Sequence, residues 1–391
     1  MNLRPASRAL RVQFFVSGLL FATWGVHVPT VARHYGLDER GLALAMLAAG
    51  VGSLAALSQA GRVVARWGPA GVARATGLIC CVAIASLVAS THLAALLALM
   101  LAFGVCASLF DVSINAEASE VERRGGGHVM SGFHAMFSLG GMCGAGLGSA
   151  AQALGVDAQQ HLLLAAALGA PAVLAACAFM LPMKPPEPGA REPLSLPHGA
   201  LALIGLLAAL GLLSEGAMYD WSVLYMKQER ASDAATAALA YAAFSAAMAL
   251  GRFGGDRVRA RWAPVTLLRA SGALAAAGMA AALLLPWAPA VLVAFGAVGL
   301  SLANVVPVLF SAASRQPGVA PAHGIAAVTS VGYLGMMAGP PLIGVVAHAT
   351  SLGTGLVAVA VFAAAMALAA QRALAPRGRA TEPAAGAADA P

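Results

Sequence analysis

The sequence predicts an all-α membrane protein in which twelve transmembrane helices form two parallel six-helix repeats. Three observations lead to this fold class. Hydrophobic residues make up 60% of the chain and charged residues only 10%, whereas an ordinary soluble domain is about one quarter charged. The apolar runs are about 20 residues long, which is the length that a helix needs to cross a bilayer. The third observation is that the chain repeats itself at half its length.

The internal repeat is clearest in a basic segment that occurs twice, 195 residues apart. Arg62-Val-Val-Ala-Arg-Trp67 returns as Arg257-Val-Arg-Ala-Arg-Trp262. So long an offset indicates duplication of a whole helical bundle rather than an array of short repeats. Glycines keep the same offset in the pairs Gly104/Gly299, Gly140/Gly335 and Gly144/Gly339.

The twelve spans follow from the apolar runs, and the basic residues between them predict the orientation. Of the 23 Lys and Arg residues, all but Arg33, Arg40, Lys227 and Arg230 fall in the termini or in alternate loops. Because basic loops stay on the cytoplasmic side, both termini are expected in the cytoplasm of a bacterial cell, with the spans in its inner membrane. The expected spans are 11–32, 41–61, 71–90, 93–116, 129–153, 161–182, 199–226, 234–254, 264–285, 288–313, 323–348 and 353–373.

Composition divides the chain into four parts. We expect a six-helix bundle over 1–182, a proline-rich cytoplasmic linker over 183–198, a second bundle over 199–374 and a disordered cytoplasmic tail over 375–391. The first apolar run lacks a cleavage site of the signal-peptide type and is expected to remain as a span. The five cysteines all fall in apolar runs, so no disulfide framework is expected.

Several classes of partner and function are excluded or disfavoured. The net charge of +7 is explained by topology, so no nucleic-acid partner is expected, and the partners are the lipid bilayer and a small solute, with the chain a monomer. The nine histidines are scattered over both sides, and no metal set, phosphate-binding loop or cofactor is expected. An integral membrane enzyme or a sensor stays a remote alternative.

Two parallel six-helix repeats with a basic segment after the second helix of each resemble the major facilitator superfamily over nearly the whole chain. The motif of the family is matched by Gly251-Arg252-Phe-Gly-Gly-Asp256-Arg257 and the following Arg261. Its first copy, with Arg62 and Arg66, has Gly61 in the place of Asp256. The resemblance implies cytoplasmic gating loops whose ionic contacts break when the two bundles rock; otherwise these basic residues only set topology.

Within that superfamily, three further segments resemble a bacterial branch near the fucose-permease-like carriers. They are Phe110-Asp111-Val-Ser-Ile-Asn115, Ser131-Gly-Phe-His134-Ala-Met-Phe and Glu215-Gly-Ala-Met-Tyr-Asp220-Trp221-Ser. The glycine-proline motif that the proton-antiporter exporters carry in the fifth span is incomplete, because Ala145 stands where proline is expected. Glycines at every fourth position there are therefore interpreted as helix packing.

Acidic side chains inside the spans are the candidate functional groups, because a charge at the centre of a membrane helix costs about 2.5–3.5 kcal/mol. Asp111 and Asn115 are four residues apart and share one helix face, and His134 is expected at a similar depth on the next helix. These three residues are predicted to bind the solute and a proton, or to form a structural hydrogen-bonded cluster. By this topology no Lys or Arg is expected deep in a span.

A second polar group is expected in the seventh span. Glu215 and Asp220 are five residues apart and must face different neighbours. His27 is expected to approach one of them when the outer side closes, with Trp24 beside it, or to be a satisfied structural histidine. Asn304 is a further candidate for the cavity wall.

The sequence therefore predicts a secondary active transporter that works by alternating access and is driven by the proton gradient. Because no buried cation is expected, an anion carrier is disfavoured, and neutral polar solutes or cations are favoured. Proton-coupled uptake of a small neutral polar, sugar-like metabolite is preferred. Proton-exchange efflux of amphiphilic compounds is the alternative.

Overall fold

The computed structural model describes residues 3–125, 129–182, 199–316, 319 and 321–374, and within them every regular element is a helix. Ten segments are long and apolar enough to cross a membrane, and the predicted all-α fold is confirmed. The helices are α1 (Arg4–Tyr35), α2 (Glu39–Trp67), α3 (Pro69–Ala85), α4 (Leu93–Gly125), α5 (Met130–Ala153), α6 (Ala158–Cys177), α7 (Ala200–Gln228), α8 (Ala234–Arg261), α9 (Pro264–Leu284), α10 (Ala288–Leu302), α11 (Val305–Ala313), α12 (Pro321–Ala349) and α13 (Leu352–Leu374).

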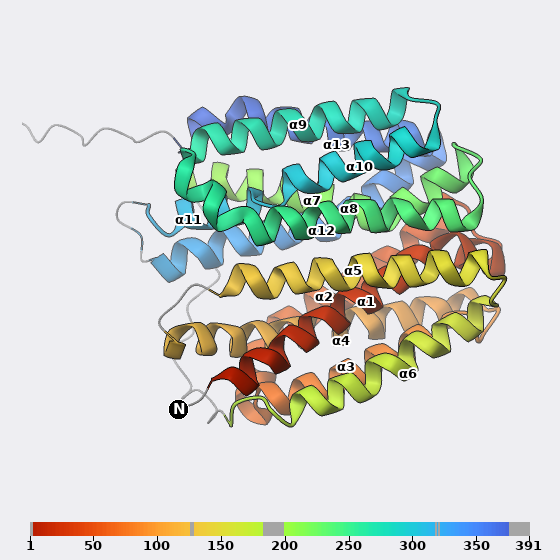
Figure 1. Ribbon diagram of the computed structural model, residues 1–391, viewed down its shortest axis with the longest axis horizontal. Coiled ribbons are helices and arrows are strands. Elements are labelled where there is room, and N and C mark those ends of the chain that lie inside the picture. The colour runs from red at the N-terminus through yellow and green to blue at the C-terminus, as the bar shows by residue number, and fades with distance from the viewer. Residues whose placement is uncertain (1–2, 126–128, 183–198, 317–318, 320, 375–391) are drawn as a thin grey trace, which may run out of the picture.

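The packing of the helices repeats with the sequence. In the N-terminal half α1 packs on α5, α2 on α4 and α3 on α6, while in the C-terminal half α7 packs on α12, α8 on α10 and α9 on α13. The halves meet mainly where α5 packs along α8 and α2 along α12, and α1 also contacts α7. Figure 1 shows the helices from α1 to α6 on one side of the molecule and those from α7 on the other.

Glycines at the repeat offset allow these close helix crossings. A Cβ on Gly104 would meet the backbone of Ala49, and a Cβ on Gly299 would meet the backbone of Phe244. The two contacts are equivalent, because each residue of the second contact lies 195 residues after its counterpart in the first. Both contacts join the second helix of a half to its fourth. Small residues at such positions let helix backbones approach closely. Close packing matters in a membrane because moving an apolar side chain from lipid into the protein gives little hydrophobic free energy.

Acidic caps start three helices at one end of the bundle. Asp38, Asp157 and Asp233 precede α2, α6 and α8, and each side chain accepts a hydrogen bond from a backbone N–H of the first turn. Hydrogen bonds from Thr236 lower the pKa of Asp233 below its ordinary value. We call this the far end, and the opposite end, with Arg62, Arg66, Arg257 and Arg261, the basic end.

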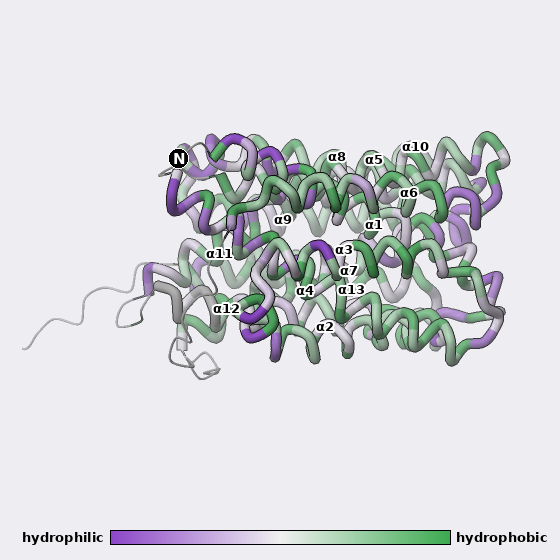
Figure 2. Tube along the Cα trace, turned by 90° about the horizontal axis from the view of Figure 1, so that it is seen from below, coloured by the Kyte–Doolittle hydropathy of each residue, from purple (hydrophilic) through white to green (hydrophobic). Residues whose placement is uncertain are grey.

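Polar residues gather at the two ends, and hydrophobic residues cover most of the length between them (Figure 2). At the far end the halves touch through polar side chains. Gln228 Nε2 donates to Glu39 Oε1 at 3.0 Å, and His348 Nδ1 lies 3.1 Å from Asp38 Oδ2. At the far end, these polar contacts therefore connect the two halves.

Several helices extend beyond the predicted spans. The predicted second, fourth and eighth spans end at residues 61, 116 and 254, but the helices continue to Trp67, Gly125 and Arg261. Hydropathy locates the part of a helix that lies in the bilayer. It does not detect polar helical turns that continue beyond the bilayer. The predicted linker at 183–198 and tail at 375–391 lie outside the described residues.

The tenth predicted span is broken. Residues 288–313 form α10 and α11, with the interruption at Ala303 and Asn304. The Asn304 side chain donates from Nδ2 to the carbonyl oxygen of Gly251 in α8 at 3.2 Å. Asn304, a predicted cavity residue, therefore fixes this break against α8.

Candidate functional site

Glu215, in the middle of α7, forms an ion pair with Arg252 of α8. Arg252 Nη2 donates to Glu215 Oε1 at 2.9 Å, and Arg252 Nη1 donates to Ser138 Oγ of α5 at 2.8 Å. Both charged side chains are mostly buried, with exposed fractions of 13% for Arg252 and 8% for Glu215. Since Ser138 belongs to the N-terminal half, this ion pair also connects the two halves.

Asp111 of α4 makes the second connection. Its Oδ1 accepts a hydrogen bond from Asn115 Nδ2 at 2.9 Å, so the two residues share a helix face as their spacing predicts. Its Oδ2 accepts from the hydroxyl of Tyr333 in α12 at 3.4 Å. Asp111, Asn115 and Tyr333 are all of intermediate exposure.

Asp220 makes the third connection, again from α7 to the N-terminal half. The indole Nε1 of Trp24 in α1 donates to Asp220 Oδ1 at 3.1 Å. Glu215 and Asp220 thus bond to different helices, in keeping with their spacing of five residues. All three intramembrane acids are therefore linked to a side chain of the opposite half, with Glu215 linked through Arg252.

His27 does not bond to either acid, contrary to the sequence-based expectation. Its Nε2 lies 2.8 Å from Nδ1 of His161 in α6, within the N-terminal half. Trp24, one turn earlier on α1, takes the position at Asp220 that was predicted for His27. A histidine 134 residues away in the sequence is a partner that spacing along one helix does not reveal.

Among the described residues, His134 of α5 forms no hydrogen bond with Asp111. Its ring packs edge-on against Phe14, with 5.2 Å between the ring centroids. It is also within electrostatic range of Arg252. The structure thus connects His134 with the Glu215 ion pair and not with Asp111.

Arg252 corrects two sequence-based expectations. It was placed in a cytoplasmic gating loop, and no cation was expected deep in a span. Instead it lies in the interior of α8, paired with Glu215. Its position next to Gly251 at the edge of the apolar run concealed this role, and the argument against an anion carrier loses its premise.

The remaining residues assigned to gating loops are on helices. Asp256 pairs with Arg259 of its own helix, one turn away, and not with a neighbouring helix. The guanidinium of Arg66 lies 5.5 Å from the ring centroid of Trp67. Arg62, Arg257 and Arg261 are exposed at the basic end of α2 and α8.

Aromatic residues lie around the ion pair of Glu215 and Arg252. The Tyr219 ring is buried 5.0 Å from that of Tyr241, measured between centroids, and its hydroxyl has no hydrogen-bond partner among the described residues. That hydroxyl lies close to Glu215 and Ser138.

Sequence reasoning missed Glu117 of α4. It is completely buried, and its Oε1 accepts a hydrogen bond at 2.7 Å from the backbone N–H of Leu181, just beyond α6. Its other oxygen has no partner among the described residues. Glu117 lies two residues after Asn115, and its position near the expected end of the fourth span made it resemble a surface residue.

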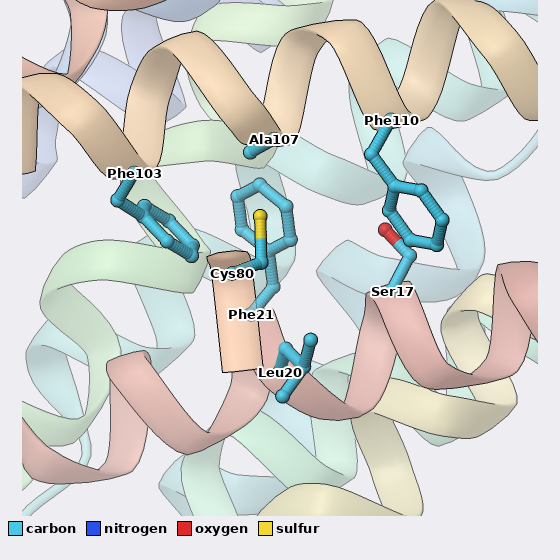
Figure 3. Close-up of a pocket in the computed structure, with 7 residues that line it drawn as sticks. All are labelled: Ser17, Leu20, Phe21, Cys80, Phe103, Ala107 and Phe110. Atoms are coloured by element: carbon cyan, nitrogen blue, oxygen red, sulfur yellow. The ribbon is translucent and has the colours of Figure 1, made fainter. Parts of the chain in front are cut away.

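A small apolar pocket lies inside the N-terminal half, away from the three acids (Figure 3). Hydrophobic side chains of α1, α3 and α4 form most of its wall, so it offers little to a polar solute. The described residues hold no group of three metal-ligating side chains. The residues that line the pocket are Ser17, Leu20, Phe21, Cys80, Phe103, Ala107 and Phe110.

Comparison with known proteins identifies the family. The profile of the Major Facilitator Superfamily matches residues 12–340. The chain belongs to this superfamily. An uncharacterized MFS-type transporter of Yersinia pestis is 34% identical over 351 residues, which cover 90% of this chain and 91% of that protein. The membrane protein MosC of Rhizobium meliloti is 30% identical, covering 89% and 85% of the two chains.

Solved structures of transporters share the fold. The nucleoside transporter NupG superposes with a TM-score of 0.72 at 15% identity, covering 96% of this chain and all of that one. A bacterial homologue of the human lysosomal transporter Spinster gives a TM-score of 0.70 at 15% identity, covering 94% and 97%. These structures show the fold, while the family match and the relative from Yersinia pestis identify the chain as a transporter and not an enzyme.

Proposed function

We propose that this major facilitator transporter moves a small hydroxyl-bearing solute by alternating access, coupled to protons. The solute binds between the halves at Asp111, Asn115 and Tyr333, next to the ion pair of Glu215 and Arg252. Protons exchange at the intramembrane acids. The driving force is the proton gradient, and the preferred direction is uptake into a bacterial cell through its inner membrane, with the termini in the cytoplasm.

The observation that carries this proposal is that each intramembrane acid is linked to the opposite half. Glu215 reaches Ser138 through Arg252, Asp111 reaches Tyr333, and Asp220 reaches Trp24. Neutralising a carboxylate weakens its hydrogen bonds, because bonds to a charged acceptor are roughly twice as strong as neutral ones. Proton uptake thus changes the free energy of association of the two halves, which is what coupled transport requires.

The finer assignments belong to this proposal. The segments around Asp111 and Glu215 support a position near the fucose-permease-like carriers. The neutral, sugar-like solute was preferred because no buried cation was expected, and Arg252 removes that reason while the polar hydrogen-bonding groups remain. Efflux of amphiphilic compounds is the second candidate for direction and is decided by the experiment below.

The experiment is a transport screen in proteoliposomes that contain the purified full-length protein. Solutes are tested with and without an imposed pH gradient, and internal pH is followed with a trapped dye. We expect at least one solute to accumulate with a proton, and Asp111→Asn to abolish the coupled proton movement. Solute movement that ignores the pH gradient would contradict proton coupling, and depletion in place of accumulation would reverse the direction.

A further inference from the structure

The charges of the central cluster do not balance. We define this cluster as Asp111, Asn115, Ser138, Glu215, Tyr219, Arg252 and Tyr333. Its only basic side chain is Arg252, which is ion-paired with Glu215. Asp111 is bonded only by two neutral donors, an amide and a phenol. Within the described part of the chain, no Lys, Arg or His pairs with this carboxylate.

We propose that Asp111 binds the protonated amino group of the solute, so that the transported class is a hydroxylated organic amine. The inference rests on the proposed function and names its substrate class. An ammonium group supplies the positive counter-charge that Asp111 lacks. A hydrogen bond from an ammonium group to an ionised carboxylate is one of the stronger hydrogen bonds in proteins. Asp111 and its partner Tyr333 lie on helices of opposite halves, so a solute between the halves would meet this carboxylate.

An anionic solute fits this cluster less well. Both terminal nitrogens of Arg252 are already engaged, one by Glu215 and one by Ser138. A solute carboxylate would add a third negative charge beside Asp111 and Glu215, with Arg252 as the one cation of the cluster to offset them. A neutral solute displaces nothing, but it leaves Asp111 without a counter-charge.

The hydroxyl of Tyr219 is an independent sign of a polar ligand. Tyr219 is only 7% exposed, and its hydroxyl has no hydrogen-bond partner in the described residues. It lies beside Glu215, Ser138 and Arg252. Because a buried hydroxyl without a partner is unfavourable, a solute hydroxyl that bonds to it adds both affinity and specificity.

The test uses matched probes that differ in charge and share their hydroxyl groups. Glucosamine is compared with glucose and glucuronate, galactosamine with galactose and galacturonate, and serinol with glycerol. Thermal unfolding of the purified full-length protein is followed with each probe near neutral pH. We expect at least one amine to raise the unfolding temperature above its neutral and acidic counterparts.

Variants assign the effect to Asp111. Asp111→Asn is expected to weaken binding of that amine by about tenfold or more, and Asp111→Glu, which keeps the charge, by less. The matched control is Asp233→Asn. Asparagine caps a helix as well as aspartate does, and Asp233 lies at the far end, outside the cluster. The unfolding temperature of each variant without probe shows whether it folds.

The results separate this inference from the proposed function. No stabilisation by any amine, equal stabilisation by a neutral or acidic partner, or full amine binding in both Asp111 variants would overturn the amine assignment. Transport of a neutral or acidic probe in proteoliposomes would contradict the amine assignment, but it would be compatible with proton-coupled transport. Amine binding without transport of any solute has the opposite meaning, because it supports the binding site and contradicts the transporter function.

Discussion

At the scale of single residues, Arg252 and Glu215 depend on each other. Removing one member of a buried ion pair leaves a charge without compensation and costs about 3–5 kcal/mol. We expect Arg252→Met to lower the free energy of unfolding by about that amount. The double variant Arg252→Met, Glu215→Met should recover most of the loss, and thermal or denaturant unfolding in detergent measures both.

The control for this pair is Arg257→Met, on the same helix. Arg257 is exposed at the basic end, and exposed substitutions usually change stability by less than about 0.5 kcal/mol. A double variant as unstable as the Arg252 single variant would show that the ion pair has favourable interactions beyond charge compensation.

Glu117 gives a second prediction at this scale. Its Oε1 satisfies the buried N–H of Leu181, so Glu117→Ala leaves that donor unpaired and should cost about 1–3 kcal/mol of stability. Glu117→Gln keeps an acceptor oxygen in place and should cost much less. Equal losses in the two variants, measured by thermal unfolding, would mean that the carboxylate charge and not the hydrogen bond matters.

The sequence predicted many of these polar residues but not most of their partners. Asp111, Glu215 and Asp220 stand out because acids are rare in apolar runs. The partner of Asp111 within one turn, Asn115, also follows from helix periodicity. The long-range partners Arg252, Trp24 and Tyr333 depend on how helices rotate against one another, which a single sequence does not specify.

At the scale of helices, glycines set how closely α1 and α5 approach. A Cβ on Gly140 would meet the backbone of Phe15, and a Cβ on Gly18 would meet the backbone of Phe137. Backbone atoms cannot move aside as a flexible side chain does. We therefore expect Gly140→Ala to destabilise the protein by about 1–3 kcal/mol through overpacking.

The same helix supplies the control. A Cβ on Gly146 meets no atom within 4 Å, so Gly146→Ala should leave the unfolding temperature unchanged or raise it through the better helix propensity of alanine. Thermal unfolding of the two variants side by side measures the difference. If Gly140→Ala is as stable as Gly146→Ala, close packing does not explain the glycine motif of α5.

Helix positions were predicted well because length and hydropathy are imposed by the bilayer. What they did not show is where a helix leaves the apolar region. The predicted eighth span ends at residue 254, whereas α8 continues to Arg261. Arg252 lies at the end of that predicted span, and the motif of the family, not hydropathy, assigned it to a gating loop.

At the scale of the whole molecule, the repeat in the sequence appears as a repeat in packing. The 195-residue offset predicted that equivalent helices exist, and the α1–α5 and α7–α12 pairs show that they also contact equivalent neighbours. The contact of α5 with α8 likewise corresponds to that of α12 with α2, but among the described residues the side-chain bonds between the halves are not repeated. Trp24 with Asp220 has no counterpart in the sequence repeat, and such contacts are free to change as the halves move.

Alternating access makes a prediction about the far end, where His348 Nδ1 lies 3.1 Å from Asp38 Oδ2 across the halves. Cysteines at these two positions, in a background without the native cysteines, can be joined by a short bifunctional thiol reagent. We expect the linked protein to lose solute transport because the far end can no longer open.

The control is a reducing agent that cleaves the linker and should restore transport. Cysteines placed on one helix, at Asp38 and Arg40 of α2, should tolerate the same reagent. If the linked protein transports at the normal rate, the far end stays closed through the cycle. The solute path would then have to run elsewhere than between the two halves, and the connections of Asp111, Glu215 and Asp220 would be static.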